Sequence, residues 1–169
     1  FLAIGYVADA TGDDKVVARS TADPAFIDLN QFITIGDDNS IILFNHRPEM
    51  GQGTYQSIPM ILAEELQVDI NSVQIRPSIA NTKLYGSQMV VGSRSIQSEF
   101  ERLRKMGAAA REMLKQAAAN TWKVDVAQCT ATNGNVVSPS GKRLTYGELV
   151  HEAAKLSPPE NPPLKHPLE

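Results

Sequence analysis

The feature that most constrains the fold is a stripe of apolar and small residues that recurs at alternating steps of four and three. Its members are Ile96, Phe100, Leu103, Gly107, Ala110, Leu114 and Ala117. This spacing places them on one face of an α-helix, so we predict a long helix that buries this stripe. Gly107 lets a second backbone pack closely in mid-helix, at a cost of about 1 kcal/mol relative to alanine.

The charged residues of the same segment fall mostly on the opposite side of the predicted helix. We expect them to form, for the most part, a solvated face: Glu99, Glu101, Arg102, Arg104, Lys105, Arg111, Glu112 and Lys115.

Shorter elements are predicted on both sides of the long helix. We predict β-hairpins over 31–45 and 128–138, a short strand over 73–76, and helices over 54–68 and 145–155. Asn133-Gly134 is the strongest short hairpin signal, and Thr145 with Glu148 has the spacing of a capping box. Pro59 is tolerated only near the start of its helix, which must therefore begin directly after Gly53. The fold class expected is α+β, a small antiparallel sheet or hairpins packed on one long and two shorter helices.

Length and charge exclude several functions. The 169 residues suffice for one domain with a core. With 16 basic against 19 acidic residues the net charge is −3, so the chain lacks the basic excess of a nucleic-acid binder. Cys129 is the only cysteine, which rules out an internal disulfide or a cysteine-built zinc or iron–sulfur site in this chain. We expect Cys129 to be a small buried hydrophobe.

We expect both ends of the chain to be truncation points within a longer protein. We divide the chain into an N-terminal arm (1–29), a domain (30–156) and a proline-rich linker (157–169). The apolar start, 1–8, fits either the remainder of an export signal or a first strand. The linker has five prolines in thirteen residues and ends in Leu168-Glu169, which matches a tagging-vector scar. We therefore expect a fragment of a longer protein.

Two short segments could carry chemistry. In Glu49–Gly53, two glycines bracket Gln52 between a strand and a helix, which would let backbone pass close to a bulky ligand while one amide is aimed at it. The same pattern is more often only a tight turn. Gly92, Ser93, Arg94 and Ser95 are predicted to open the long helix, and a helix N-terminus with hydroxyls and a guanidinium suits a phosphate. Capping and surface charge explain those residues more simply.

Other polar residues give weaker signals. His46, His151 and His166 are widely spaced and are interpreted as structural or surface residues, with no metal ligand predicted. Glu64 and Glu65 point about 100 degrees apart on a helix and do not converge. Taken from the residues alone, there are two candidate cofactor contacts and no nucleophile, base or metal set.

Several motifs, in order along about 30–165, resemble one family. They are EMGQG (49–53), AEEL (63–66) with VD (68–69), GSRS (92–95), GAAAREML (107–114) and LTYGELV (144–150). Together they are similar to the molybdenum-cofactor-binding subunit of the xanthine dehydrogenase and aldehyde oxidase family. The nearest branch is that of the isoquinoline 1-oxidoreductase β subunit and related membrane-associated aldehyde dehydrogenases. The segment 30–156 would then be part of a molybdenum-cofactor-binding domain.

The resemblance assigns roles to the two segments. It implies that Gln52, between Gly51 and Gly53, lies beside the molybdenum centre as a catalytic residue, and that Gly92, Ser93, Arg94 and Ser95 lie near the pterin dinucleotide. The implied cofactor is molybdopterin cytosine dinucleotide with molybdenum. The implied reaction hydroxylates a small-molecule substrate, an aldehyde or an N-heteroaromatic carbon, with oxygen from water.

The resemblance also sets expectations about the whole protein. It implies a 2Fe-2S small subunit, a cytochrome c as electron acceptor, and an export signal that would make the protein periplasmic or inner-membrane-associated. The family's general-base glutamate and its other glycine-rich loop have no match here, so we expect the fragment alone to be inactive and to form a homodimer through an exposed apolar face. The alternative is a non-catalytic exported binding or scaffold protein, which a full-length sequence lacking that glutamate would favour.

Overall fold

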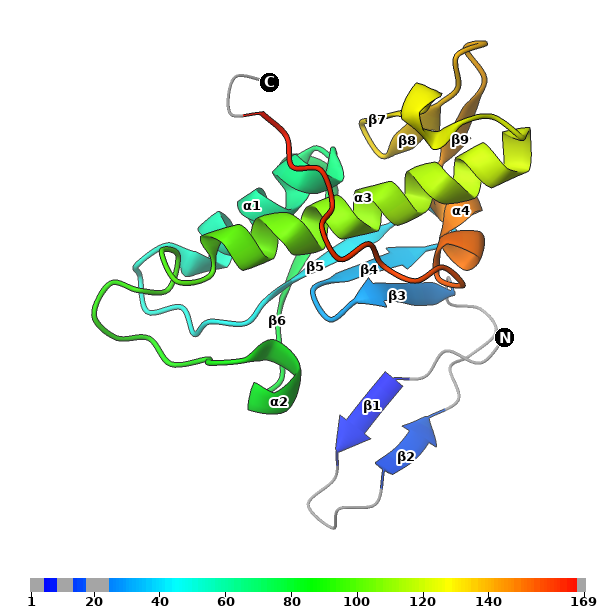
Figure 1. Ribbon diagram of the computed structural model, residues 1–169. Helices are drawn as coiled ribbons and strands as arrows, with labels where there is room; N and C mark the ends of the chain where they lie inside the picture. Colours follow the sequence, from blue (N-terminus) through cyan, green and yellow to red (C-terminus); the bar gives the residue numbers. More distant parts are fainter. Residues whose placement is uncertain (1–4, 9–13, 18–24, 167–169) are drawn as a thin grey trace.

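The computed structural model describes residues 5–8, 14–17 and 25–166 (Figure 1). Most of the predicted N-terminal arm and the Leu168-Glu169 pair lie outside the described residues. Within the arm, β1 (Gly5–Ala8) pairs antiparallel with β2 (Asp14–Val17).

A four-stranded sheet forms the framework of the domain. Its order is β3 (Phe26–Asn30), β4 (Ile33–Gly36), β5 (Ile41–Asn45) and β6 (Gln74–Pro77). The first three strands pair antiparallel, which confirms the hairpin predicted over 31–45. Strand β6 pairs parallel to β5, with Asn45 opposite Pro77. The sheet is therefore mixed rather than purely antiparallel, because the chain crosses over through a helix between β5 and β6.

Three helices pack around this sheet and close the core. They are α1 (Thr54–Leu66), α3 (Phe100–Trp122) and α4 (Tyr146–Ala153), with a short α2 (Thr82–Tyr85) after β6. In Figure 1, α3 runs across the sheet with α1 beside it and α4 near its C-terminal end. Together with the fully buried Phe32, Ile35 and Leu43 of the sheet region, they confirm the predicted α+β class.

The stripe of α3 packs as predicted over most of its length. Leu103, Ala110 and Leu114 are fully buried. A Cβ built on Gly107 would lie 2.7 Å from the carbonyl oxygen of Leu62 in α1, so the two backbones do approach closely there. The stripe prediction is wrong at Phe100, which is 48% exposed.

The predicted start of the long helix is also wrong. Helix α3 begins at Phe100, and the preceding residues form turns. Gly92 and Ser93 adopt left-handed backbone angles, with φ of 62° and 57°, which a helix cannot accommodate. Gly92–Ser95 therefore belongs to the loop between α2 and α3 and does not form a helix N-terminus.

The C-terminal part of the domain agrees with its sequence signals. A second sheet consists of β7 (Thr130–Thr132), β8 (Asn135–Val137) and β9 (Arg143–Thr145), of which β9 was not predicted. Short 3-10 helices cover Ile70–Ser72 and Val126–Gln128. Thr145 and Glu148 form the predicted capping box at α4. Cys129 is buried, as expected.

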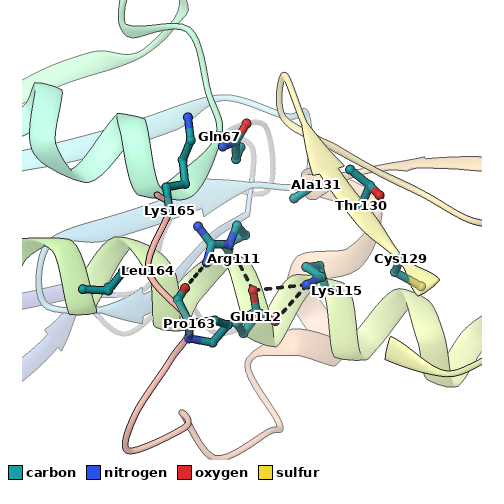
Figure 2. Close-up of a pocket in the computed structure, with 10 residues that line it drawn as sticks. All are labelled: Gln67, Arg111, Glu112, Lys115, Cys129, Thr130, Ala131, Pro163, Leu164 and Lys165. Atoms are coloured by element: carbon teal, nitrogen blue, oxygen red, sulfur yellow. Dashed lines mark hydrogen bonds and ion pairs between the residues drawn. The ribbon is translucent and has the colours of Figure 1, made fainter. Parts of the chain in front are cut away.

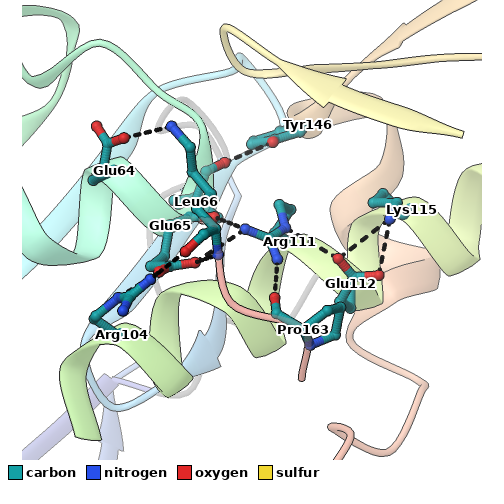
Figure 3. Close-up of polar contacts among 10 residues, drawn as sticks. Glu64, Glu65, Leu66, Arg104, Arg111, Glu112, Lys115, Tyr146 and Pro163 are labelled. Atoms are coloured by element: carbon teal, nitrogen blue, oxygen red, sulfur yellow. Dashed lines mark hydrogen bonds and ion pairs between the residues drawn. The ribbon is translucent and has the colours of Figure 1, made fainter. Parts of the chain in front are cut away.

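Arg111 and Glu99 were predicted on a solvated face but are buried. Arg111 joins α3 to α1 through Glu65 (Figure 3). Glu65 of α1 is 1% exposed and accepts hydrogen bonds from Arg104 at 2.6 Å and Arg111 at 3.1 Å. We call Glu65, Arg104 and Arg111 the Glu65 clamp. Glu99 pairs with residues of the sheet edge.

The proline-rich tail packs on this clamp. Arg111 donates to the carbonyl oxygen of Pro163, and Arg104 donates to that of Lys165 at 2.6 Å. The Lys165 amide donates to Glu65 at 3.1 Å. The end of the predicted linker is thus fastened to the domain up to at least Lys165.

Candidate functional site

The parallel pairing of β5 and β6 brings the starts of the two chain segments that carry the predicted site residues to one edge of the sheet. The chain leaves the carboxyl end of β5 into the loop 46–53, and the carboxyl end of β6 into the loop 78–99. The amide of Ser78 donates to the carbonyl oxygen of Asn45 at 2.8 Å, so the two exits lie together. In α/β sheets, ligands bind outside the carboxyl ends of such strands.

Glu49 organises the first loop. Its carboxylate accepts hydrogen bonds from the amides of Gly51 at 2.7 Å, Gly53 at 3.0 Å and Tyr55 at 2.7 Å. These bonds, led by the one from Tyr55, lower the pKa of Glu49 to about 2. An ionised carboxylate therefore caps the N-terminal end of α1 and shapes the glycine loop. An acidic residue just before a predicted helix was the signal for this role, and the sequence analysis did not use it.

Gln52 is exposed, and its amide folds back on its own loop. Its Oε1 accepts from the Met50 amide at 2.6 Å, while its Nε2 donates to the Pro48 carbonyl at 2.7 Å and to the Thr54 hydroxyl at 3.0 Å. Both N–H donors are thus used internally, and one lone pair of Oε1 remains available. A ligand oxygen at this amide would have to take the place of Pro48 or Thr54.

The glycines of both segments face open space. A Cβ added at Gly51, Gly53 or Gly92 would meet no atom within 4 Å, and all three have positive φ. Large apolar side chains beside them are exposed: Met50 at 71% and Met89 at 65%. This edge therefore has room for a bulky group and an apolar surface for something to cover.

The second segment presents an exposed cation. The guanidinium of Arg94 makes no hydrogen bond or ion pair with any residue that the structure describes. Ser95 is 8% exposed. Across the described ranges, no hydrogen bond or ion pair joins Gln52 to Gly92–Ser95, so the two segments share an edge without direct polar contact.

A buried polar group beneath both loops was missed by the sequence analysis. We call His46, Arg47, Glu99 and Arg102 the Arg47 junction. Arg47 pairs with Glu99 at 2.9 Å, and Arg102 pairs with Glu99 at 3.1 Å. An arginine two residues after a buried strand was the available signal, but its partner lies 52 residues away in sequence.

His46 lies within the junction and is 1% exposed. Its ring packs edge-on against Phe32, with 5.2 Å between centroids, and neither ring nitrogen has a hydrogen-bond partner among the described residues. Its Nε2 lies 3.7 Å from a Glu99 oxygen. Burial lowers the pKa of His46 to about 4, against the opposing pull of Glu99, so the ring is neutral at pH 7. The expectation of a structural role fits this position.

The structure also has a cavity of about 470 Å³ away from these loops (Figure 2). Its lining is Gln67, Arg111, Glu112, Lys115, Cys129, Thr130, Ala131, Pro163, Leu164 and Lys165. None of these is a predicted site residue, and its cations are paired with Glu65, Glu112 and Glu64. Within the part of the chain that is described, no three His, Cys, Asp or Glu side chains could hold a metal ion together. None of the described helices is both long and apolar enough to span a bilayer.

The fold and the edge define a ligand-binding domain built on a strand–helix–strand unit, with glycine loops at its carboxyl edge. Residues 16–166 match the model of the molybdopterin cofactor-binding domain, and the chain belongs to that family. The family named by the sequence resemblance is thereby confirmed.

Three curated relatives are similar over most of this chain. The beta chain of isoquinoline 1-oxidoreductase from Brevundimonas diminuta is 34% identical over 169 residues, covering 96% of this chain and 21% of that protein. A nicotinate dehydrogenase subunit from Pseudomonas putida is 31% identical over 73% of this chain and 10% of its own length. The membrane-bound aldehyde dehydrogenase [pyrroloquinoline-quinone] of Gluconacetobacter polyoxogenes is 28% identical over 75% of this chain and 17% of its own length. The chain thus spans about a fifth of these relatives or less.

A solved structure shows the same fold. Quinoline 2-oxidoreductase from Pseudomonas putida 86 aligns with a TM-score of 0.56 at 19% identity, over 76% of this chain and 17% of that one. The chain is therefore related to molybdenum-dependent oxidoreductases through one part of their cofactor-binding region.

Proposed function

We propose that this chain forms one wall of the active site in the large subunit of a molybdenum hydroxylase, an oxidoreductase that hydroxylates an aldehyde or an N-heteroaromatic carbon with oxygen from water. The observation that carries the proposal is the parallel β5–β6 pair, because the segments that carry Gln52 and Gly92–Ser95 leave the sheet at the same carboxyl edge. Relatives named for isoquinoline, nicotinate and aldehyde support this substrate class.

The residues at the edge fit a large, anionic cofactor. Gly51, Gly53 and Gly92 leave open space where any side chain would project. The exposed Arg94 guanidinium, with the hydroxyls of Ser93 and Ser95, would hold a phosphate of the cytosine dinucleotide form. When bound, the cofactor would supply the two-electron oxidation of the substrate carbon.

Gln52 is the catalytic residue of this proposal. Its amide is preoriented by Pro48, Met50 and Thr54, and an exchange of the Pro48 or the Thr54 contact would direct an N–H at an oxygen of the bound group. The ionised Glu49 keeps the loop closed beneath it, because it holds the amides of Gly51 and Gly53. The chain would thus position and polarise, and no residue described here acts as general base.

The rest of the assembly is part of the same proposal. The full-length protein would pass electrons to a 2Fe-2S small subunit and then to a cytochrome c, in the periplasm or at the inner membrane; one relative's name describes it as membrane-bound. The present chain alone would be inactive. Its exposed Met50, Met89 and Val91 would drive a homodimer, which light scattering would detect.

Elemental mass spectrometry of the full-length protein, co-expressed with its iron–sulfur partner, tests the proposal. We expect about one molybdenum per polypeptide, and none on the 169-residue chain. In the same protein, Gln52→Ala should lower turnover while folding is retained. Gln56→Ala, an exposed glutamine on the first turn of α1, is the matched control. A fully active Gln52→Ala protein would contradict the assigned role, and a metal-free full-length protein would favour a scaffold.

A further inference from the structure

We propose that Arg47 is the positioning residue that holds the Gly92–Ser95 loop in place beside the Gln52 loop. The functional meaning of this role rests on the proposed function, whereas the role itself follows from the contacts of one buried guanidinium. Arg47 is 5% exposed and lies between the end of β5 and the Pro48–Gly53 loop.

Arg47 contacts the chain on both sides of Gly92–Ser95. One nitrogen, Nη1, donates to the carbonyl oxygen of Met89 and lies 3.5 Å from the Ser87 hydroxyl. The other, Nη2, donates to Glu99 at 2.9 Å. Gly92–Ser95 is the middle of the segment between Met89 and Glu99, so a single guanidinium fastens the loop before and after the proposed phosphate contacts.

The backbone of Arg47 is itself fixed to the sheet. The Asn45 side chain donates to the Arg47 carbonyl at 2.7 Å and accepts from the Arg47 amide at 3.2 Å. Since Asn45 is the last residue of β5, the guanidinium projects from a rigid element. The sheet, the Gln52 loop and the Gly92–Ser95 loop are therefore linked through one residue.

Between these contacts, the hydrogen bonds described for residues 91–98 are local, and Ile96 adds apolar packing against the core. Ser98 donates from its amide at 3.0 Å and from its hydroxyl at 2.7 Å, both to the Arg94 carbonyl, and the Arg94 amide reaches Val91 at 3.4 Å. Arg102 supports the far end from α3, donating to Glu99 at 3.1 Å and to the Tyr85 carbonyl at 2.7 Å. Loss of the two Arg47 contacts, to Met89 and to Glu99, should therefore release the Gly92–Ser95 loop without unfolding α3.

Lysine cannot replace the two-nitrogen guanidinium contact of Arg47. It keeps the positive charge but offers one ammonium group, which cannot reach Met89 and Glu99 with two separately oriented nitrogens. Arg111→Lys is the matched control, because Arg111 is 7% exposed and also bridges a buried glutamate and a backbone carbonyl, those of Glu65 and Pro163. The two variants make the same chemical change at equally buried positions.

Trypsin cleavage after Arg94 measures the release of the loop, because proteolysis follows the population of the locally open form. The full-length protein is digested in its cofactor-free form, and the peptide ending at Arg94 is quantified by mass spectrometry. We expect cleavage about tenfold faster in Arg47→Lys and in Glu99→Gln than in wild type, and unchanged in Arg111→Lys. Position 47 adds no competing site, since Pro48 follows it.

Molybdenum content supplies the second readout. In the cofactor-loaded protein we expect less metal per polypeptide in Arg47→Lys than in Arg111→Lys. Wild-type cleavage rates in both Arg47→Lys and Glu99→Gln would overturn the inference, and so would an equal acceleration in Arg111→Lys. Accelerated cleavage in a protein whose wild type holds no molybdenum would uphold the positioning role and overturn the proposed function instead.

Discussion

The Glu65 clamp and the Arg47 junction are both buried ion-pair clusters, yet they differ in how fully their polar atoms are partnered. Glu65 accepts from Arg104, Arg111 and the Lys165 amide. In the junction, both ring nitrogens of His46 and the Nε of Arg47 are buried without a hydrogen-bond partner in the part of the chain that the structure describes. The clamp joins two helices and the tail, whereas the junction lies beneath two exposed loops.

This difference suits what each cluster does. A fully satisfied buried network adds rigidity, and a partly satisfied one costs free energy that the rest of the fold must offset. Natural proteins concentrate such departures at functional sites. The orphan nitrogens of the junction lie under the edge that carries Gln52 and Arg94, while the complete clamp lies along α1 and α3 away from it.

Removal of the Glu65 carboxylate should have the largest effect. Glu65→Ala leaves Arg104 and Arg111 without their shared anion, and we expect a loss of about 3–5 kcal/mol in the free energy of unfolding. Urea denaturation measures it. Glu112→Ala is the control, because the Glu112 side chain is 15% exposed against 1% for Glu65 and pairs with Arg111 and Lys115 of its own helix, so a smaller loss of about 1 kcal/mol is expected. Equal losses of unfolding free energy in both variants would show that the Glu65 clamp stabilises the fold no more than the Glu112 ion pairs do.

Acid should weaken the junction through His46. The folded pKa of about 4 lies below the unfolded value of 6.5, so the unfolded state binds more protons between these pH values. Stability is therefore full above pH 6.5 and falls as the pH drops toward 4, by about 3 kcal/mol from this group. The charged groups that face the ring are Glu99, Arg47 and Arg102.

His46→Leu sharpens this test. It removes the titration and both unpartnered ring nitrogens, so we expect a flatter pH dependence of the unfolding free energy between pH 6.5 and 4 and little loss at pH 7. Chemical denaturation at stepped pH measures both quantities. An equally steep profile in the variant would show that His46 is not the group that titrates.

Gly107→Ala should destabilise the contact between α1 and α3 next to the clamp. Alanine is the better helix former, but its Cβ would lie 2.7 Å from the Leu62 carbonyl oxygen and 2.8 Å from the Glu65 Cβ. We expect a net loss of about 2 kcal/mol because the helices must move apart. Ala108→Gly on the same helix is the control, where only the helix preference of about 1 kcal/mol is removed along with one methyl group. A more stable Gly107→Ala variant would contradict the close packing.

Local signals in the sequence predicted much of the fold. The α3 stripe, the turn at Asn133-Gly134 and the Thr145–Glu148 capping box are each decided by residues within a few positions of one another. Contacts across the chain were not readable in that way. Glu99 and Arg111 were placed on a solvated face because their partners, Arg47 and Glu65, lie 52 and 46 residues away.

The candidate site shows the same division. The pattern of Gly51 and Gly53 around Gln52 was visible, and so was Arg94, although their roles came from the family resemblance rather than from spacing. The parallel pairing of β5 and β6 was missed, since the helix between the strands was not interpreted as a crossover. The helix predicted to start at Gly92 begins instead at Phe100, because Gly92 and Ser93 have positive φ angles that a right-handed helix does not contain.

Glu49→Gln should have the smallest effect on stability, and it tests the exposed glycine loop next to the Arg47 junction. The folded pKa of Glu49, about 2, lies below the unfolded value of 4.5, so its stabilisation is complete above pH 4.5 and is lost as the pH falls toward 2. Glutamine keeps one acceptor but turns an amide toward the Tyr55 N–H and the Thr54 hydroxyl. We expect the variant to be less stable at pH 7 and to converge with wild type near pH 2, which thermal unfolding across that range measures. A difference that stays constant with pH would mean that the carboxylate charge does not hold the loop, and that Gly51 and Gly53 keep their conformation without it.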